Sequence, residues 1–568
     1  MDTAISLSAL NFVATTKIIL VLAILACLVA WRRRRGAAVH LAVVTAALAI
    51  FYCLLAWPLQ KMWWGNNGDE MFVGAAMTRA VSGGFFRDFY YSWLPPFYPP
   101  LYFWVIGLVG AVLHLTTLAT LKFGVASTLV AAGWLPFLLA AWFWRGRPRR
   151  AEDEGLRSPW FWALAPVLFL LVVDFDAIIL KPYEILPAIL VALWIGWLAV
   201  SLGDERWSWR QYAWFGISGG LLFIAYYFWW FMIIPAMLVL ALWSGSRGRG
   251  LVRFFVIGVI MAAVASPYLA PLAWAFWRYG VESWQAAYFM PADFHTFVPW
   301  GIGDVRAWLY LGGLVTIAVY RRHPFVRGLG VALAACYAYQ AVNLVVFAVG
   351  GHPAQMAKPF LFLGSAILMT AAAYGIVQGM AWLGARQPRA KAAAGVALIA
   401  LLLPLSPFVR FADDPVVQMQ IGKDMTPPTA ESLAKKLATA VPDYEQRVWL
   451  SSGVPDINLY LPLTYFIAYN PHFSHPSSLY SRRLEYLREM LSAGSPQEFS
   501  RLAASADPPI NALLLYRDKA SGKFPVFLWQ DNYPNGGKEE RLNLDPKLID
   551  PAAWHQAWGN SEWAILTR

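Results

Sequence analysis

Two adjacent carboxylates, Asp69 and Glu70, stand between long apolar runs in the segment NNGDEMFVGAAMTRA. A carboxylate can act as a general base on a hydroxyl group, and it can also cap the N-terminus of a helix. Apolar residues recur at helical spacing over 70–81, so the sequence predicts an amphipathic helix with Asp69 as its cap. Adjacent side chains at a helix start point in different directions. Both are therefore candidate catalytic residues that need not act as a pair, and we favour Asp69 as the base, with capping as its alternative role.

A second charged cluster lies in the segment DFDAIILKPYE and contains Asp174, Asp176, Lys181, Tyr183 and Glu184. The lysine can bind an anion such as phosphate, or it can form a structural ion pair with Glu184. A charge costs about 2.5 to 3.5 kcal/mol at the centre of a membrane span and less near its end. A cluster of charges between two apolar runs therefore indicates a functional site.

Further candidate residues are spread along the chain: Arg79, Asp88, His295, His352 and Lys358. Arg79 is expected to contact lipid headgroups or to bind a phosphate. Lys358 has the same two uses, because a long basic side chain next to an apolar run can extend to the headgroups. A metal ion held by the two histidines and a carboxylate is an alternative, although their spacing matches no compact ligand motif.

The composition places these residues in a membrane protein with several spans. Of the 568 residues, 59% are hydrophobic and 16% are aromatic, far more than in a soluble domain. The net charge of +12 comes from short basic clusters between apolar runs, which is typical of cytoplasmic loops and not of a nucleic-acid surface. The three cysteines all lie inside apolar runs and exclude a disulfide framework or a cysteine metal site.

The apolar runs predict about twelve membrane spans, the first retained and not removed as a signal peptide. They lie at roughly 10–31, 37–59, 118–144, 159–173, 185–202, 212–227, 228–243, 252–276, 307–320, 325–349, 359–383 and 393–409. The run 99–115 would be a thirteenth span, but counting it would place the basic cluster 145–150 on the opposite side from the cluster 32–35. A helix lying at the outer interface keeps all basic loops in the cytoplasm.

This orientation puts the candidate residues on one side of the membrane. The segments around Asp69, Lys181, His295 and His352 all become outward loops. We therefore expect a bacterial inner or plasma membrane protein whose site faces the periplasm or the cell exterior.

After residue 409 the composition changes to that of a soluble domain. Probable strands at 511–516, 525–529 and 563–568 alternate with helices at 430–441 and 477–494, so 410–568 is predicted to be an outer α/β domain. The predicted organisation is a transmembrane catalytic domain over 1–409, whose outer loop 60–117 carries interfacial helices, followed by this second domain.

Several ordered segments resemble a known family. They are GDEMFVGAAMTRAVSGGFFRDFYYSWLPPFYPPLYFWVIG, KPYE, SWQAAYFMPADF and YNPHFSHPSSLYSRRLEYLREM. Together they resemble the AftA-like galactan arabinofuranosyltransferases of the mycobacterial cell wall and, more broadly, the GT-C membrane glycosyltransferases. The resemblance implies a GT-C-type fold and transfer of D-arabinofuranose from a polyprenyl phosphate to a glycan hydroxyl on the outer face.

The resemblance also assigns roles to residues. It implies that Asp69 is the catalytic carboxylate and that Lys181 and Glu184 belong to the active site. Glu70 stands where the family's glutamine is expected, and its added charge would alter binding of the donor or of a metal. The transfer needs no nucleotide, and a divalent metal ion is left open as a cofactor. Because the outer domain is compact, the acceptor need not be mycobacterial galactan.

The mechanistic hypothesis is a single inverting displacement in which phosphate leaves toward Lys181, Arg79 and Lys358. One alternative is a GT-C enzyme that moves another polyprenyl-phosphate sugar, such as aminoarabinose or a hexose, onto lipid A, a glycan or a protein. A second is a polyprenyl-lipid flippase with Asp174, Asp176 and Lys181 along its path, although a flippase predicts charges in mid-span. The sequence contains no Walker loop, GxGxxG or HExxH motif, which disfavours ATP-driven transport and metal-dependent proteolysis.

Overall fold

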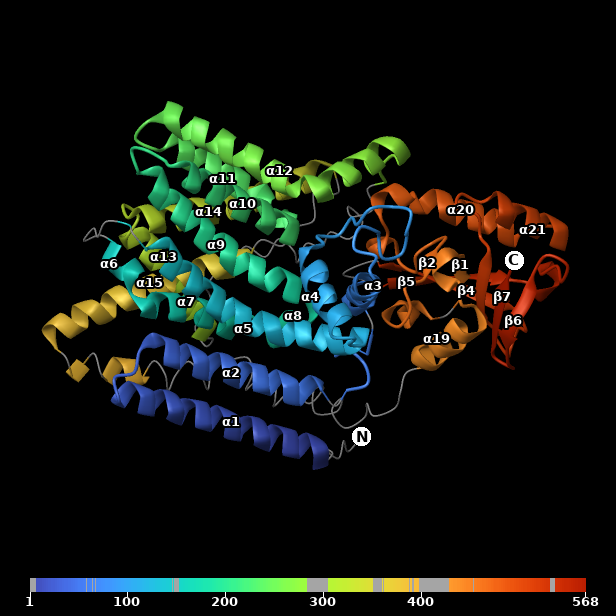
Figure 1. The fold of residues 1–568 in the computed structure, drawn as a ribbon, viewed down its shortest axis with the longest axis horizontal. Helices are drawn as coiled ribbons and strands as arrows, with labels where there is room; N and C mark the ends of the chain where they lie inside the picture. Colours follow the sequence, from blue (N-terminus) through green and yellow to red (C-terminus); the bar gives the residue numbers. More distant parts are fainter. Residues whose placement is uncertain are drawn as a thin grey trace.

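A computed structural model of the chain describes residues 7–57, 59–63, 65–66, 68–145, 147, 153–282, 305–350, 360, 362–387, 389–390, 393–397, 429–452, 454–531 and 537–568. These residues form a bundle of long helices with a C-terminal domain at one end of it (Figure 1). The polytopic helical architecture with a C-terminal α/β domain is therefore confirmed, whereas the expected boundary at 409/410 lies outside the described residues.

The bundle is built from apolar helices because a helix satisfies its own backbone hydrogen bonds in lipid. Its long helices are α1 (Leu7–Arg32), α2 (Ala37–Ala56), α5 (Thr117–Phe143), α7 (Pro159–Val172), α9 (Pro182–Leu202), α10 (Trp209–Ala225), α11 (Trp230–Leu242), α12 (Arg247–Tyr279), α13 (Val305–Val319), α14 (Pro324–Gly350) and α15 (Leu363–Arg386). Shorter elements join them, namely α3 (Asp69–Val81), α4 (Leu101–Val112), α6 (Glu154–Arg157), α8 (Phe175–Leu180) and η2 (Tyr227–Trp229).

The number of spans differs from the expected twelve. Among the described residues, seven helices are long and apolar enough to cross a membrane: α1, α2, α5, α9, α12, α14 and α15. An eighth span results if α10 and the segment 227–242, which meet at a bend of 114°, are counted as one. The helices α7 and α13 have 14 and 15 residues and fall below that length. Twelve spans are thus not confirmed, although the predicted runs that are described fall on helices.

Helix α9 is the centre of the bundle. It packs against α5, α10, α11, α14 and α15, and an apolar helix surrounded in this way is buried on all sides. Glycines bring α14 close to it: a Cβ at Gly328 would lie 2.7 Å from the Ala199 Cβ, and one at Gly196 would lie 2.5 Å from the Phe325 ring. Small residues permit such close helix packing in membranes. The N-terminus of α9, at Lys181 and Pro182, therefore has a fixed position.

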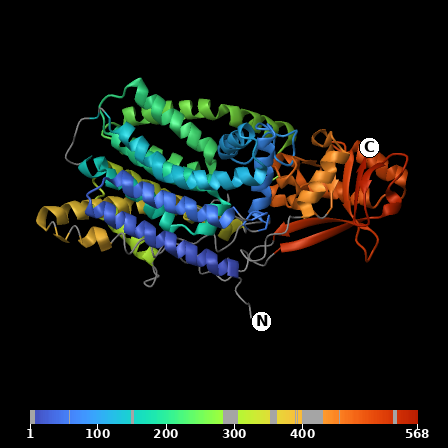
Figure 2. The ribbon, with the colours of Figure 1, turned by 60° about the horizontal axis from the view of Figure 1, so that its bottom comes forward.

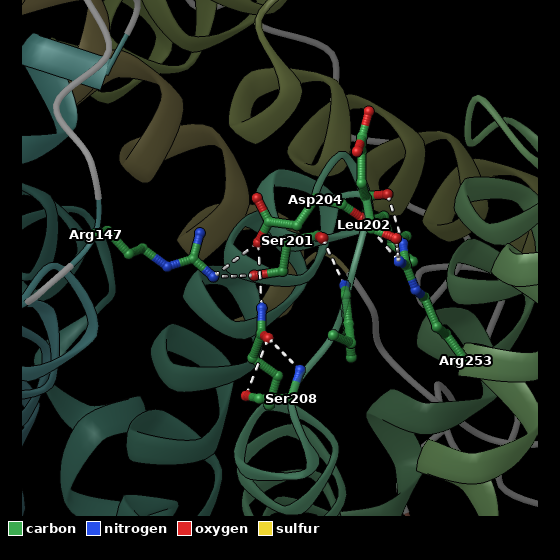
Figure 3. A network of polar contacts seen from close by, with 9 residues as sticks. Arg147, Ser201, Leu202, Asp204, Ser208 and Arg253 are labelled. Atoms are coloured by element: carbon green, nitrogen blue, oxygen red, sulfur yellow. Dashed lines mark hydrogen bonds and ion pairs between the residues drawn. The ribbon is translucent and has the colours of Figure 1, made fainter.

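A polar network joins the helices at the end of the bundle away from the C-terminal domain (Figure 3). Arg147, which follows α5, donates to the Ser201 hydroxyl at 2.8 Å and lies 3.4 Å from the Asp204 carboxylate. Arg253 of α12 donates to the carbonyl oxygens of Leu202 and Asp204 at 2.9 and 2.7 Å. Two basic clusters thus bind the same α9–α10 turn, which agrees with the predicted placement of both on one side of the membrane.

Helices α3 and α4 lie at the opposite end, between the bundle and the C-terminal domain (Figures 1 and 2). Helix α4 has 12 residues, so it is about 18 Å long and too short for a hydrocarbon core of about 30 Å. The apolar run 99–115 is therefore not a span, as the distribution of basic clusters predicts.

The C-terminal domain contains a five-stranded mixed sheet in the order β2-β1-β3-β7-β6, in which β1 is parallel to β2 and β3 and the other pairs are antiparallel. A separate antiparallel hairpin is formed by β4 and β5. The strands are β1 (Val448–Ser451), β2 (Thr464–Tyr465), β3 (Ala512–Tyr516), β4 (Phe524–Asp531), β5 (Gly537–Leu544), β6 (His555–Gly559) and β7 (Trp563–Thr567). The helices are α19 (Thr429–Ala440), α20 (Tyr480–Leu491) and α21 (Pro496–Ser505), with the 3₁₀ helix η6 (Pro455–Leu459) after β1. Every predicted strand and helix of this domain is present.

The sheet joins the domain to the bundle. On β3, successive side chains point to opposite faces. Ala512 and Leu514 belong to a core that continues into the helical bundle, whereas Leu513 and Leu515 belong to a separate core with α20 and α21. Burial on both faces explains why this strand is apolar throughout. The C-terminal domain therefore packs against the bundle and its outer loop through a shared apolar core.

Candidate active site

The loop before α3 sets the direction of the first candidate carboxylate. Gly68 is the N-cap of α3 with φ 58°, a left-handed conformation that glycine adopts without steric cost. Asp69 and Glu70 occupy the first turn, and no side chain caps the helix. This corrects the expectation that Asp69 is the N-cap: it is the first helical residue, and its carboxylate contacts another part of the chain.

That contact is Lys181, which lies between two carboxylates. Its Nζ is 3.1 Å from Asp69 Oδ2 and 3.5 Å from Glu184 Oε1. Asp69 and Lys181 are 28% and 24% exposed, while Glu184 is 4% exposed. Lys181 is fixed because Pro182 begins α9 immediately after it, and proline favours the first helical position. The structure thus brings together three of the predicted site residues, with Lys181 within ion-pair distance of both Asp69 and Glu184.

The charges around Lys181 keep it protonated. Burial alone lowers the pKa of a lysine, but the charges of Asp69 and then Glu184 raise it more strongly, so the net pKa of Lys181 is raised. The protonated Nζ in turn favours the ionised form of a neighbouring carboxylate. Asp69 is therefore a partly exposed carboxylate beside a positive charge that favours its ionised form, which is the form that a general base requires.

Three tyrosines surround this cluster. The hydroxyls of Tyr98 and Tyr183 are 3.5 Å apart, and the Tyr226 hydroxyl hydrogen-bonds the Glu184 carboxylate. Burial, and then the charge of Glu184, raises the pKa of Tyr98, so its hydroxyl stays protonated and can donate a hydrogen bond. Tyr183 was predicted from the sequence, whereas Tyr98 and Tyr226 were not. The signal for Tyr98 was a Pro- and Tyr-rich composition and that for Tyr226 an aromatic run, and an aromatic membrane belt shares both.

Glu70 has a different environment from Asp69. It is 1% exposed, and its Oε2 accepts a hydrogen bond from the backbone N–H of Asn66 at 3.1 Å. Adjacent side chains at the helix start thus contact different groups, as expected. Its described contact is with the loop that precedes α3.

Arg79 joins α3 to the C-terminal domain, whereas Asp88 binds backbone groups within the outer loop. Arg79 follows Asp69 by ten residues, or about 15 Å along α3, and donates to the carbonyl oxygen of Leu463 at 3.0 Å. Burial lowers its pKa to about 10, although the charge of Asp88 opposes this shift. Asp88 Oδ1 accepts the N–H groups of Tyr90 and Tyr91 at 3.0 Å, and burial raises the pKa of Asp88 to about 7. The structure does not bring Arg79 to the Asp69–Lys181 cluster.

The remaining candidates are separate from this cluster or outside the described residues. Asp174 forms a 2.6 Å ion pair with Arg306 at the start of α13, and Asp176 Oδ1 accepts the N–H of Ala177 at 2.8 Å. Across the described ranges, no three His, Cys, Asp or Glu side chains lie close enough together to hold a metal ion. The predicted residues outside the described part of the chain are His295, His352 and Lys358.

Comparison with known sequences agrees with the expected resemblance. The galactan 5-O-arabinofuranosyltransferase of Mycobacterium tuberculosis is 24% identical over 530 residues, which cover 85% of this chain and 76% of that protein. The protein of the same name from Mycolicibacterium smegmatis is 24% identical over 559 residues, covering 92% and 86%. This chain is thus similar to galactan arabinofuranosyltransferases over most of its length. No protein-family profile matches it.

Two solved structures are similar in overall arrangement. Both are ArnT from Cupriavidus metallidurans, one bound to undecaprenyl phosphate and one in the apo state. The first has a TM-score of 0.45 at 12% identity and covers 92% of this chain and 97% of that chain. The second has a TM-score of 0.48 at 13% identity and covers 94% and 98%.

Proposed function

We propose that this protein is a membrane glycosyltransferase that moves D-arabinofuranose from a polyprenyl-phosphate donor to a hydroxyl of a cell-surface glycan. The similarity to proteins named galactan 5-O-arabinofuranosyltransferase over 85–92% of the chain supports the class of reaction. The observation that carries the proposal is the ion pair of Asp69 with Lys181, 3.1 Å long, at the end of the bundle that carries α3 and α4.

The reaction is a displacement at the anomeric carbon. As the acceptor oxygen forms its bond to this carbon, Asp69 takes the hydroxyl proton. The bond from the anomeric carbon to the phosphate oxygen breaks, and polyprenyl phosphate leaves with the bonding electrons. A positioned general base contributes about 10²- to 10⁴-fold to such a step, and the rest comes from orientation and charge stabilisation.

Lys181 has two tasks in this proposal. It holds Asp69 in its ionised form, and its Nζ supplies positive charge to the leaving phosphate. Because Asp69 and Glu184 both neutralise Nζ, a phosphate needs additional positive charge. Lys358 is the candidate for this charge. Tyr98, whose hydroxyl is a donor, is placed to hydrogen-bond a phosphate or sugar oxygen.

The membrane gives the site its access to the donor. The polyprenyl chain would lie among lipids beside the bundle while the sugar phosphate reaches the end that carries α3 and α4. We place this end on the periplasmic or outer face, because the basic clusters that bind the α9–α10 turn lie at the other end.

The direct test is a donor panel. The full-length protein in lipid nanodiscs would be incubated with polyprenyl phosphates carrying arabinofuranose, aminoarabinose or hexoses, and with oligogalactan, lipid A or peptide acceptors. We expect arabinofuranose to be transferred to a glycan, detected by mass and linkage analysis of the product. Transfer of only another sugar would establish the alternative GT-C activity. No transfer from any donor, together with donor movement between leaflets, would favour a flippase.

A further inference from the structure

Asn66 connects the loop before Asp69 to the C-terminal domain. It is 1% exposed and has φ 67°, a left-handed conformation that asparagine tolerates better than most residues. Its Oδ1 accepts the backbone N–H of Met62 at 2.9 Å, and its own N–H donates to Glu70 Oε2 at 3.1 Å. The side chain and the backbone N–H of one residue therefore together hold the turn that leads into the catalytic helix α3.

The remaining group of Asn66, the Nδ2 amide, points to the C-terminal domain. It donates to Asp456 Oδ2 at 3.3 Å and to the Tyr460 hydroxyl at 3.4 Å. These partners lie 390 and 394 residues further along the chain, in η6 and just after it. The donors and acceptors of the Asn66 side chain are thus divided between the catalytic loop and the C-terminal domain.

The segment 455–465, which we name the clamp segment, follows α3 beyond this contact. A Cβ at Gly74 would lie 2.6 Å from Leu459 Cδ1, so the clamp segment packs directly on the backbone of α3. One turn later the Thr78 hydroxyl bonds the Leu459 carbonyl oxygen at 2.9 Å, and Arg79 then donates to the Leu463 carbonyl oxygen. The clamp segment therefore contacts α3 from the loop before it to its last turn.

We propose that Asn66 is a positioning residue through which the C-terminal domain holds Asp69 in its reactive geometry, so that this domain is a working part of the active site. The expected effect on kcat rests on the proposed function, whereas the structural link between Asn66 and the C-terminal domain does not. A displacement of about 1 Å at a reacting group can cost about 10²-fold in rate, so a loop held from another domain is a sensitive control point. A movement of the C-terminal domain, for example when a glycan binds to it, would therefore be transmitted to Asp69.

A polarity swap tests the proposal. The Asn66→Asp variant keeps the acceptor for Met62 but places an oxygen against Asp456 Oδ2 instead of a donor. The double variant Asn66→Asp with Asp456→Asn restores one donor and one acceptor in reversed order. We expect kcat to fall about 10²-fold in the single variant with KM for the donor nearly unchanged, and to recover to within about fivefold of the wild type in the double variant.

A second readout does not depend on activity. Amide hydrogen exchange of the segment 62–71 should be faster in Asn66→Asp and return to wild-type protection in the double variant. If the wild type transfers no sugar, the proposed function fails. The exchange rates then still decide whether Asn66 fixes the loop before α3 to the clamp segment. Loss of both kcat and protection in the double variant would overturn the proposal, and so would wild-type kcat and protection in Asn66→Asp.

The matched control reverses another polar pair of the same domain. Arg488 and Glu540 form an ion pair between α20 and β5, away from the clamp segment. The double variant Arg488→Glu with Glu540→Arg should leave kcat and the exchange of 62–71 unchanged. A loss there as large as in Asn66→Asp would show a general instability of the domain and overturn the specific role of Asn66.

Discussion

Lys181 controls the charge of the candidate site because two carboxylates share its one ammonium group. Asp69 and Glu184 lie on either side of Nζ and raise the pKa of Lys181, so the lysine stays charged across the physiological pH range. The charged Nζ favours the ionised form of Asp69, while Glu184 lies on the buried side of the cluster. We therefore propose that the partly exposed Asp69 meets substrate and that the buried Glu184 orients the lysine.

Lys181→Met tests this role. The variant leaves Asp69 and Glu184 without their shared cation, so one carboxylate should gain a proton and transfer should fall by at least about 10²-fold. The rate constant would be measured with saturating donor at several pH values, because the remaining activity should move to higher pH. The control is Lys435→Met, which removes an exposed lysine paired with Glu431 on α19 and should leave transfer unchanged. Normal transfer by Lys181→Met would contradict the role.

The raised pKa of Asp88 predicts how the stability of the protein changes with pH. Burial raises its pKa in the folded protein from 3.8 to about 7. Between these values the folded state binds more protons than the unfolded state, so this residue lowers the stability as pH rises from about 4 to 7. Asp88→Asn keeps an acceptor for the N–H groups of Tyr90 and Tyr91 and removes the titration. Its Tm relative to the wild type should rise between pH 5 and pH 8; a constant difference would refute the shift.

Helix α3 shows which elements follow from sequence and which do not. Its bounds, Asp69–Val81, agree with the predicted 70–81 because its apolar spacing is local information. The cap was predicted wrongly: Gly68, with its positive φ, is the N-cap, and Asp69 instead pairs with Lys181, more than 100 positions later in the chain. The role of Asn66 was not predicted for the same reason, since its amide partners lie about 390 residues later.

The contact between α3 and the clamp segment gives a prediction at the scale of elements. Gly74→Val should push Leu459, which is buried, away from α3 and cost about 1 to 3 kcal/mol of stability, as overpacking typically does. Transfer should fall more than the loss of folded protein explains, because Asp69 lies on the same helix. Gly258→Val on α12 is the control, since a Cβ there meets no atom within 4 Å. Equal Tm and activity in the two variants would contradict the packing role.

At the scale of the whole molecule, the basic clusters predicted the orientation of the helices better than hydropathy predicted the number of spans. The parity of the basic loops predicted that the clusters around Arg147 and Arg253 lie at the same end of the molecule. In the structure both arginines bind the segment where α9 ends and the turn to α10 begins. The predicted number of spans was not confirmed, because hydropathy finds apolar runs but not the directions in which their helices run. The runs 212–227 and 228–243 each form a helix, yet they meet at 114°.

The two ends of the molecule should be accessible from opposite sides of the membrane. In a chain whose Cys27, Cys53 and Cys336 are replaced by alanine, Lys523→Cys tests the C-terminal domain and Arg210→Cys tests the α9–α10 end. Both positions are exposed. A membrane-impermeant thiol reagent should label the first in intact cells and the second only after permeabilisation. The reverse pattern would invert the proposed orientation.

The central claim is that the carboxylate of Asp69 is the general base of a sugar transfer from a polyprenyl phosphate. Asp69→Asn keeps the size of the side chain and a hydrogen-bond acceptor, but it cannot accept the proton of the acceptor hydroxyl at neutral pH. The decisive measurement is the single-turnover rate of this variant with polyprenyl-phosphoarabinofuranose and a glycan acceptor, alongside its affinity for the donor. The account predicts a rate at least about 10²-fold below wild type with donor affinity within a few fold. Transfer at the wild-type rate would contradict it.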